Sequence, residues 1–433
     1  MPDIRFELPE INTWRLVNKA VSQRGVVDMV EAWEAHGYRF GCVCIDDGWT
    51  VDGKLGDWEP DPQRFPDLAG LVEWIHAKDY AVRLWVAPIQ FHAGTKIAAR
   101  AFPECVLKNA DDEPAFYTGL GTYRIDPRTK VGQAHIRDTM QRLIRDYHVD
   151  AFKCDFPPFY FPDDEFYREQ RFAFPEHDKQ TMVQNFYRLV RESIDAVDPC
   201  VRVECARDLP DCQPYINDTI CGDLVGHDRN WAMYVEIAER LRRFTQGTEI
   251  TPWLEMAWGE GSDAPTPKVD WYAGILEYIA ASINLELKLE HSFQPFAYPN
   301  AAQIRCLTNL YGPRNRRYKV LHTGRKSITV QDMLDAGVQV GPATRFLAAP
   351  EEPLTITLHT AALGTNALAW RARNVLTGAP VNLRARNEFW GGTLNGCHVD
   401  FEAEARQVYE LWHEGEPDPY FRELYREQQE SSR

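Results

Sequence analysis

Residues 130–155 read KVGQAHIRDTMQRLIRDYHVDAFKCD, and this stretch decides the fold. Apolar side chains recur at helical spacing over residues 130–147, and residues 151–154 form a short apolar run of strand length that ends at Asp155. A long amphipathic helix followed at once by a buried strand is half of a βαβ unit. The stretch therefore predicts a parallel sheet covered by helices.

The same alternation extends over the first three-quarters of the chain. Strands are expected at residues 11–16, 40–46, 81–86, 151–154, 201–205, 219–221, 253–257 and 285–289. Helices are expected at residues 25–35, 68–77, 130–147, 178–196, 229–244, 270–281 and 300–310. Eight strands and a similar set of helices predict a (β/α)₈ TIM barrel. No GxGxxG or Walker-type loop supports an open doubly wound sheet.

The pattern changes near residue 320. Short β-rich segments separated by turn residues follow, including SITV, LTITLHT, ALAWRARNV and GCHVDFEA. This spacing is typical of a small antiparallel β-sandwich. We therefore expect a barrel domain over residues 1–320 and a C-terminal sandwich domain over residues 321–433.

Composition limits the possible partners. The 433 residues carry 48 Lys and Arg against 64 Asp and Glu, a net charge of −16. Nucleic acid and anionic membranes require a basic surface, so neither is expected as a partner. Several of the ten Cys lie in apolar runs, no CxxC pair is present, and no signal peptide or membrane-spanning run is seen. We expect a soluble cytoplasmic protein, and its composition is compatible with a homo-oligomer.

Carboxylates gather where the expected strands end. Asp46 and Asp47 end the second, Asp155 the fourth, and Asp223 follows the sixth, while Glu204 lies in the fifth. Because the carboxyl ends of parallel barrel strands form the mouth, these side chains should meet there.

Three segments carry a family resemblance. IDDGW (45–49), followed by GDWEPDPQRFP (56–66), and the FKCDF strand end resemble the family 36 glycoside hydrolases, which with family 27 form a clan of mostly retaining α-galactosidases. The similarity runs from about Trp14 to Asp223. It implies an oligosaccharide or glycoside substrate, no cofactor and no metal.

The resemblance also assigns roles. Asp155 matches the nucleophile, and Lys153 should lower its pKa and bind sugar hydroxyls. Asp223 matches the acid/base, although the Arg common before it in the family is replaced here, and Asp228 is its rival. Retention requires the two carboxyl groups about 5–5.5 Å apart.

Further residues are expected to bind substrate. Asp46 and Asp47 match the pair that accepts hydrogen bonds from sugar O4 and O6, and Glu204 matches a position near O2. Aromatic walls of the pocket are expected from Trp14, Trp49 and Trp85. Arg207 is expected to replace the missing Arg. His92 and His291 could each touch substrate, although a lone His is more often a structural residue, and Asp208 could replace the missing Arg together with Arg207. Rim candidates without a family position are Trp258, Glu260 and Glu290.

Three alternatives remain open. The same two-aspartate chemistry could serve an α-glucosidase, an α-N-acetylgalactosaminidase or a transglycosylase. A metal-dependent barrel hydrolase could use Asp46, Asp47, His92 and Asp155, but no HxH spacing supports it. A non-catalytic sugar-binding barrel would need both catalytic positions replaced, and both are Asp.

Overall fold

The computed structural model describes most of the first half of the chain and parts of the second. The described residues are 3–35, 40–108, 112–117, 119–156, 176–205, 210–221, 240–241, 243–257, 288–292, 320–323, 326–335, 344–350, 352–360, 369–374, 379–390, 393–405 and 407–413. From Trp253 to the end of β10, throughout β11 and for some residues elsewhere, only the backbone is described. No helix in these ranges is both long and apolar enough to cross a membrane.

Eight parallel strands close into a barrel, which confirms the predicted fold. In sequence order they are β1 (Glu10–Asn12), β2 (Cys42–Ile45), β3 (Ala81–Val86), β7 (Ala151–Cys154), β8 (Arg202–Cys205), β9 (Asp218–Cys221), β10 (Thr251–Ala257) and β11 (Lys288–Ser292). Each strand pairs with its neighbour, and β11 pairs with β1 to complete the ring.

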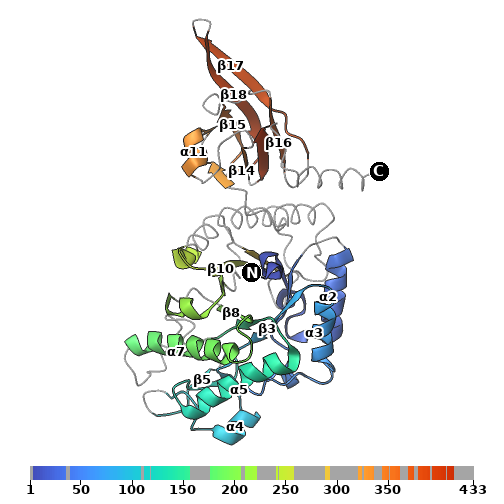
Figure 1. The fold of residues 1–433 in the computed structure, drawn as a ribbon, viewed down its shortest axis with the longest axis vertical. Coiled ribbons are helices and arrows are strands. Elements are labelled where there is room, and N and C mark those ends of the chain that lie inside the picture. Colours follow the sequence, from blue (N-terminus) through green and yellow to red (C-terminus); the bar gives the residue numbers. More distant parts are fainter. Residues whose placement is uncertain are drawn as a thin grey trace. The chain divides into compact units, whose positions relative to one another are not determined.

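Helices connect the strands on the outside of the barrel (Figure 1). The longer ones are α2 (Gln23–Ala35), α3 (Leu68–His76), α5 (Lys130–Tyr147) and α7 (Glu176–Asp195). The short ones are η1 (Ile4–Glu7), α1 (Trp14–Val17), η2 (Asn18–Ala20), η3 (Val51–Gly53), α4 (Lys96–Ala101) and η4 (Pro210–Tyr215). Helix α5 begins where Thr129 Oγ1 accepts from the Gly132 N–H, and buries a stripe that includes Ile136, Met140 and Leu143.

One expected strand is corrected by the structure. The first ends at Asn12 rather than at residue 16, because the Asn12 side chain accepts from the Trp14 N–H at 2.7 Å and turns the chain into α1. Trp14 therefore lies in a helical turn, not on a strand. The eighth strand is described from Lys288 to Ser292, and residues 285–287 of its expected range lie outside the described residues.

A small sheet interrupts the barrel between β3 and α5. It has the order β4 (Gln90–His92), β6 (Thr122–Arg124) and β5 (Phe116–Tyr117), all antiparallel. Its strands have two or three residues, too short to give a period in the sequence.

The C-terminal region forms two sheets. Their strands are β12 (Val320–Thr323), β13 (Ser327–Ile328), β14 (Arg345–Pro350), β15 (Leu354–His359), β16 (Trp370–Asn374), β17 (Arg384–Trp390), β18 (Thr393–Ala403) and β19 (Tyr409–His413), with helix α11 (Val330–Asp335). The orders are β12-β14-β19-β16 and β13-β15-β18-β17, antiparallel except for the parallel edge strands β12 and β13. Trp370, Phe346, Phe401 and Leu411 lie in one shared core, as expected for a sandwich.

The chain divides into two compact units. One comprises Met1–Pro267 with Leu287–Tyr298, and the other comprises Lys268–Glu286 with Pro299–Arg433. Residues 301–319 lie outside the described residues, so the boundary at residue 320 stays a prediction.

Candidate active site

Asp155 stands directly after β7. Its N–H donates to Val86 O at 2.9 Å, which extends the β3–β7 ladder by one step and fixes the backbone under the carboxylate. Trp85 Nε1 donates to Asp155 Oδ2 at 3.1 Å, and the Phe156 N–H donates to Oδ1 at 2.7 Å. The side chain remains partly exposed. Two described donors thus orient the carboxylate, and the residue is partly exposed to solvent.

Asp46 follows β2 and is surrounded by the protein. Its Oδ2 accepts from Asn12 Nδ2 at 2.9 Å and from Lys153 Nζ at 3.0 Å, and its Oδ1 accepts from the Asp47 N–H at 2.8 Å. The Asp46 N–H itself donates to Thr13 Oγ1. Asp46 and Lys153 are both almost fully buried, so they form an ion pair in which each compensates the other's charge.

Asp47 is buried but less well satisfied. Its residue is 5% exposed, and its Oδ1 has no hydrogen-bond partner among the described residues. Burial raises the pKa of the Asp47 carboxyl, an effect that Lys19 opposes and the charge of Asp46 strengthens. Lys19 Nζ lies 3.3 Å from Asp47 Oδ2. A buried acceptor without a donor is costly, so this oxygen suits a ligand hydroxyl.

Aromatic rings line the same strand ends. Trp49 is fully buried, and its Nε1 donates to Trp85 O at 2.9 Å. Trp58 lies between the Trp49 and Trp85 rings, with centroids about 6 Å away from each. Trp85 in turn meets the Phe156 ring edge to face at 6.5 Å. Trp49 therefore supports Trp85, and Trp85 holds the Asp155 carboxylate.

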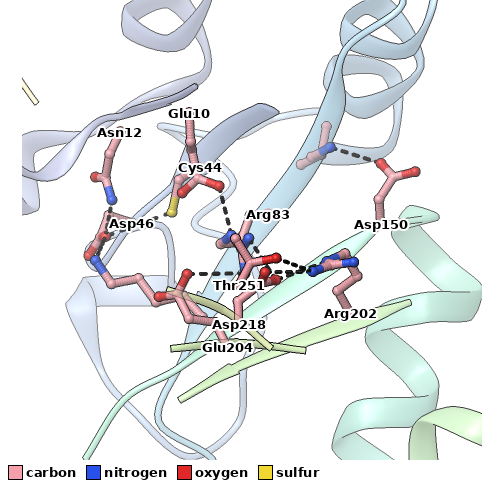
Figure 2. A network of polar contacts seen from close by, with 12 residues as sticks. Glu10, Asn12, Cys44, Asp46, Arg83, Asp150, Arg202, Glu204, Asp218 and Thr251 are labelled. Atoms are coloured by element: carbon pink, nitrogen blue, oxygen red, sulfur yellow. Dashed lines mark hydrogen bonds and ion pairs between the residues drawn. The ribbon is translucent and has the colours of Figure 1, made fainter. Parts of the chain in front are cut away.

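Glu204 lies inside the barrel in a network of charges (Figure 2). Its Oε2 is 3.2 Å from Arg83 Nη1, and the same guanidinium reaches Glu10 Oε2 at 2.7 Å and Asp218 Oδ2 at 3.2 Å. Arg202 adds a second cation, with Nη2 at 2.6 Å from Asp218 Oδ1. Burial raises the pKa of Glu204 to about 8, against the opposing pull of Arg83, so the carboxyl holds its proton at neutral pH.

Small side chains make room for this network. Barrel interiors are usually filled by branched apolar residues. Here Cys42, Ala81 and Ala151 line the lower interior with Phe6, and Arg202 stacks on the Phe6 ring at 5.0 Å. The space that larger residues would fill is occupied by the Arg83 side chain, which is fully buried.

His92 has a structural role in this geometry. Its Nδ1 accepts from the Leu55 N–H at 2.9 Å, and its Nε2 lies 3.1 Å from Leu120 O. Burial lowers the pKa of His92, so the ring is neutral and joins two backbone segments. Among the described residues, no group of three or more His, Cys, Asp and Glu side chains is arranged to hold a metal ion.

Most of the remaining candidates lie where the side chain or the whole residue is not described. Trp14 is half-buried in α1. The side chains of Glu290 and His291, on β11, are not described. Asp223, Asp228, Arg207, Asp208, Trp258 and Glu260 lie outside the described residues. The structure thus brings together Asp46, Asp47, Lys153, Asp155 and Trp85, and the role of every candidate residue stays a prediction.

Sequence reasoning missed three contributors. Asn12 donates a hydrogen bond to Asp46, Lys19 pairs with Asp47, and Arg83 pairs with Glu204. A signal existed for Arg83, because a lone cation inside the apolar run AVRLWV must meet carboxylates. Lys19 stands in a connecting segment with no pattern to mark it.

Comparison with known proteins supports the resemblance. Residues 11–197 match the family model described as the glycosyl hydrolases family 31 TIM-barrel domain. Over 151 residues, 34% of this chain, the sequence is 30% identical to α-galactosidase 2 of Pediococcus pentosaceus, covering 20% of that protein. It is 24% identical over 154 residues, 35% of this chain, to 21% of the mouse myogenesis-regulating glycosidase.

Solved structures share the fold. A family 36 α-galactosidase from Geobacillus stearothermophilus, in complex with raffinose, aligns with a TM-score of 0.57 at 12% identity. The α-galactosidase from Lactobacillus brevis gives the same TM-score and identity. The matches cover 94% and 95% of this chain and 55% of each of those chains. This chain therefore spans about half the length of those structures and about a fifth of the curated relatives.

Proposed function

Starting from a TIM barrel like those of glycosidase families 31 and 36, we propose that this chain is a retaining glycoside hydrolase that removes terminal α-linked galactose. The observation that carries the proposal is the Asp155 carboxylate. It follows the fourth barrel strand, is oriented by Trp85 and Phe156, and remains partly exposed. Asp155, Lys153, Asp46 and Asp47 all fall within the segment that matches the family model.

The reaction follows from the chemistry of a positioned carboxylate. One Asp155 oxygen attacks the anomeric carbon, the bond to the leaving oxygen breaks, and an acid protonates that oxygen. Water, deprotonated by the same group, then cleaves the glycosyl ester and restores Asp155. We assign the acid/base role to Asp223, with Asp228 as the alternative.

Binding would use the neighbouring strand ends. Asp47 Oδ1, which has no hydrogen-bond partner among the described residues, would accept a hydrogen bond from a sugar hydroxyl. The Asp46–Lys153 pair would present a further donor and acceptor. The galactose specificity is supported by the Pediococcus pentosaceus relative. Raffinose, seen with the Geobacillus stearothermophilus enzyme, is therefore the first natural substrate to test.

The test is covalent labelling. A fluorinated or cyclitol mechanism-based inhibitor with galactose stereochemistry should label the protein once, on the peptide that contains Asp155. Asp155→Asn should lower turnover of an aryl α-galactoside by about 10³-fold or more and abolish labelling, because no nucleophile remains. Asp52→Asn, a change of the same kind at an exposed loop carboxylate, serves as the control.

Labelling of another residue would refute Asp155 as the nucleophile. A wild-type chain that turns over aryl α-glucosides but no α-galactosides would refute the sugar assignment and leave the mechanism standing.

A further inference from the structure

The segment that follows β1 is fastened to the loop that follows β2. Gly48 has φ +111°, and a Cβ built there would lie 2.7 Å from both Cα and O of Lys19. Arg64 spans the two segments, since its Nη1 donates to Lys19 O at 2.7 Å and its Nη2 donates to Thr50 O at 3.0 Å. Arg64 is itself oriented by Asp61, whose Oδ2 accepts a hydrogen bond from Arg64 Nε at 3.1 Å. The Lys19 backbone is therefore fixed against Asp47 and Gly48 by close packing and two hydrogen bonds.

This arrangement gives each aspartate of the Asp46–Asp47 pair a cation of its own. Lys153 approaches Asp46 from the barrel interior, and both of their side chains are under 10% exposed. Lys19 approaches Asp47 from the solvent side: its side chain is 53% exposed, whereas that of Asp47 is 8% exposed. Without Lys19, the second buried carboxylate would stand beside Asp46 with no countercharge among the described side chains.

We infer that Lys19 is a positioning residue of the substrate site: it pairs with Oδ2 of Asp47 and thereby orients this carboxylate, with Oδ1 left to accept a substrate hydroxyl. The inference rests on the proposed function, because it assumes that the ligand at Asp47 is a sugar. Nothing in the sequence pattern or in the family resemblance assigns Lys19 a role.

The charges around Asp47 agree with this role. Burial raises the pKa of Asp47 most, Lys19 lowers it and Asp46 raises it, while Lys153 pairs with Asp46. His92 is close enough for Lys19 to lower the pKa of its ring, so it is neutral and supplies no replacement charge. Removal of Lys19 should therefore favour the protonated form of Asp47, which is a poorer acceptor.

A matched pair of lysines makes the test specific. Lys54 also acts on the His92 ring and is similarly exposed at 48%, but it pairs with Asp52, an exposed carboxylate. Lys19→Met and Lys54→Met thus remove the same charge from neighbouring loops. Lys19→Arg restores a cation at the first position.

Steady-state kinetics with an aryl α-galactoside and with raffinose should separate binding from chemistry. Lys19→Met should raise KM about tenfold with kcat within about twofold, because a hydrogen bond to a charged group is lost equally from the bound substrate and the transition state. Lys19→Arg should recover most of the loss, and Lys54→Met should behave as wild type. Thermal unfolding of each variant checks that the fold is intact.

A double variant tests whether Lys19 acts through Asp47. On an Asp47→Asn background, Lys19→Met should change KM by less than about twofold. The inference would be overturned if Lys19→Met raised KM about tenfold on the Asp47→Asn background as well. It would also be overturned if Lys19→Met alone left KM unchanged, or if Lys19→Met and Lys54→Met had equal effects. A wild-type chain without α-galactosidase activity would instead refute the proposed function, and the two failures are therefore distinct.

Discussion

At the scale of single residues, the neighbours Asp46 and Asp47 differ in how fully their carboxylates are hydrogen-bonded. Both Asp46 oxygens accept hydrogen bonds from the protein, whereas Asp47 has an oxygen without a donor among the described residues. A satisfied carboxylate contributes to stability, and an unsatisfied one is available to a ligand. The pair therefore divides two tasks between adjacent positions.

Substitution should reveal this division. Asp46→Asn removes the carboxylate charge that pairs with the buried Lys153 ammonium, which should lower the free energy of unfolding by about 3–5 kcal/mol. Asp47→Asn should change stability little, because burial already disfavours its charge, and should raise KM for an α-galactoside. Urea unfolding and steady-state kinetics on both variants provide the measurement. A larger loss of stability in Asp47→Asn than in Asp46→Asn would contradict the assignment.

The site was predictable where strand ends carry the chemistry. Asp46, Asp47, Lys153 and Asp155 follow or end apolar runs, and parallel strands bring such residues to one edge. Lys19 was not predictable, because its contact with Asp47 depends on how two connecting segments pack. The placement of Glu204 also required the structure, since the sequence cannot show which cation its carboxylate meets.

At the scale of elements, helix α5 shows how closely a helix start can be fitted to its loop. Gly132 lies in the first turn, and a Cβ there would be 2.3 Å from Asp126 O, a backbone atom that cannot move alone. Gly25 also lies in a first turn, that of α2, but its Cβ would meet only the Ser22 hydroxyl at 3.3 Å.

Alanine substitution should therefore give different results in the two helices. Gly to Ala in a helix normally stabilises by up to about 1 kcal/mol. Gly132→Ala should instead destabilise by about 1–3 kcal/mol, because the loop before α5 must shift. Gly25→Ala should stay within about 1 kcal/mol of wild type. Chemical unfolding of both variants tests this, and equal effects would argue against the close approach at Asp126.

Elements with a strong period were predicted well. The ranges expected for α5, β3 and β7 agree with the structure. The first strand was predicted too long, because the apolar residues after Asn12 continue the pattern while a side-chain hydrogen bond turns the backbone. The sheet of β4, β5 and β6 gave no signal, because strands of two or three residues are held by pairing partners distant in sequence.

At the scale of the whole barrel, the interior combines charge with small side chains. Arg83 pairs with Glu10, Glu204 and Asp218, which come from three different strands, and Arg202 also pairs with Asp218. Two cations against three carboxylates leave one negative charge uncompensated among these five described side chains. Protonation of Glu204 removes it, in agreement with the direction in which burial moves its pKa.

This proton should make the stability of the barrel depend on pH. The pKa of Glu204 is about 8 in the folded protein, against an ordinary value of 4.5. Between these values the folded state keeps a proton that the unfolded chain has lost. The Glu204 contribution to the free energy of unfolding is therefore present at low pH and declines as pH rises from about 4.5 to 8, by up to about 1.4 kcal/mol per pH unit.

Glu204→Gln should remove this dependence, because the amide is neutral at every pH and has nearly the same shape as the protonated acid. We expect the variant to match wild type near pH 4.5 and to exceed it in stability near pH 8. The control is Glu73→Gln, at an exposed position on α3, which should leave the wild-type slope unchanged. Urea unfolding followed by tryptophan fluorescence across this range measures the slopes. If Glu204→Gln kept the wild-type slope, the carboxyl would be ionised inside the barrel, and the Arg83 guanidinium would have to neutralise it together with Glu10 and Asp218.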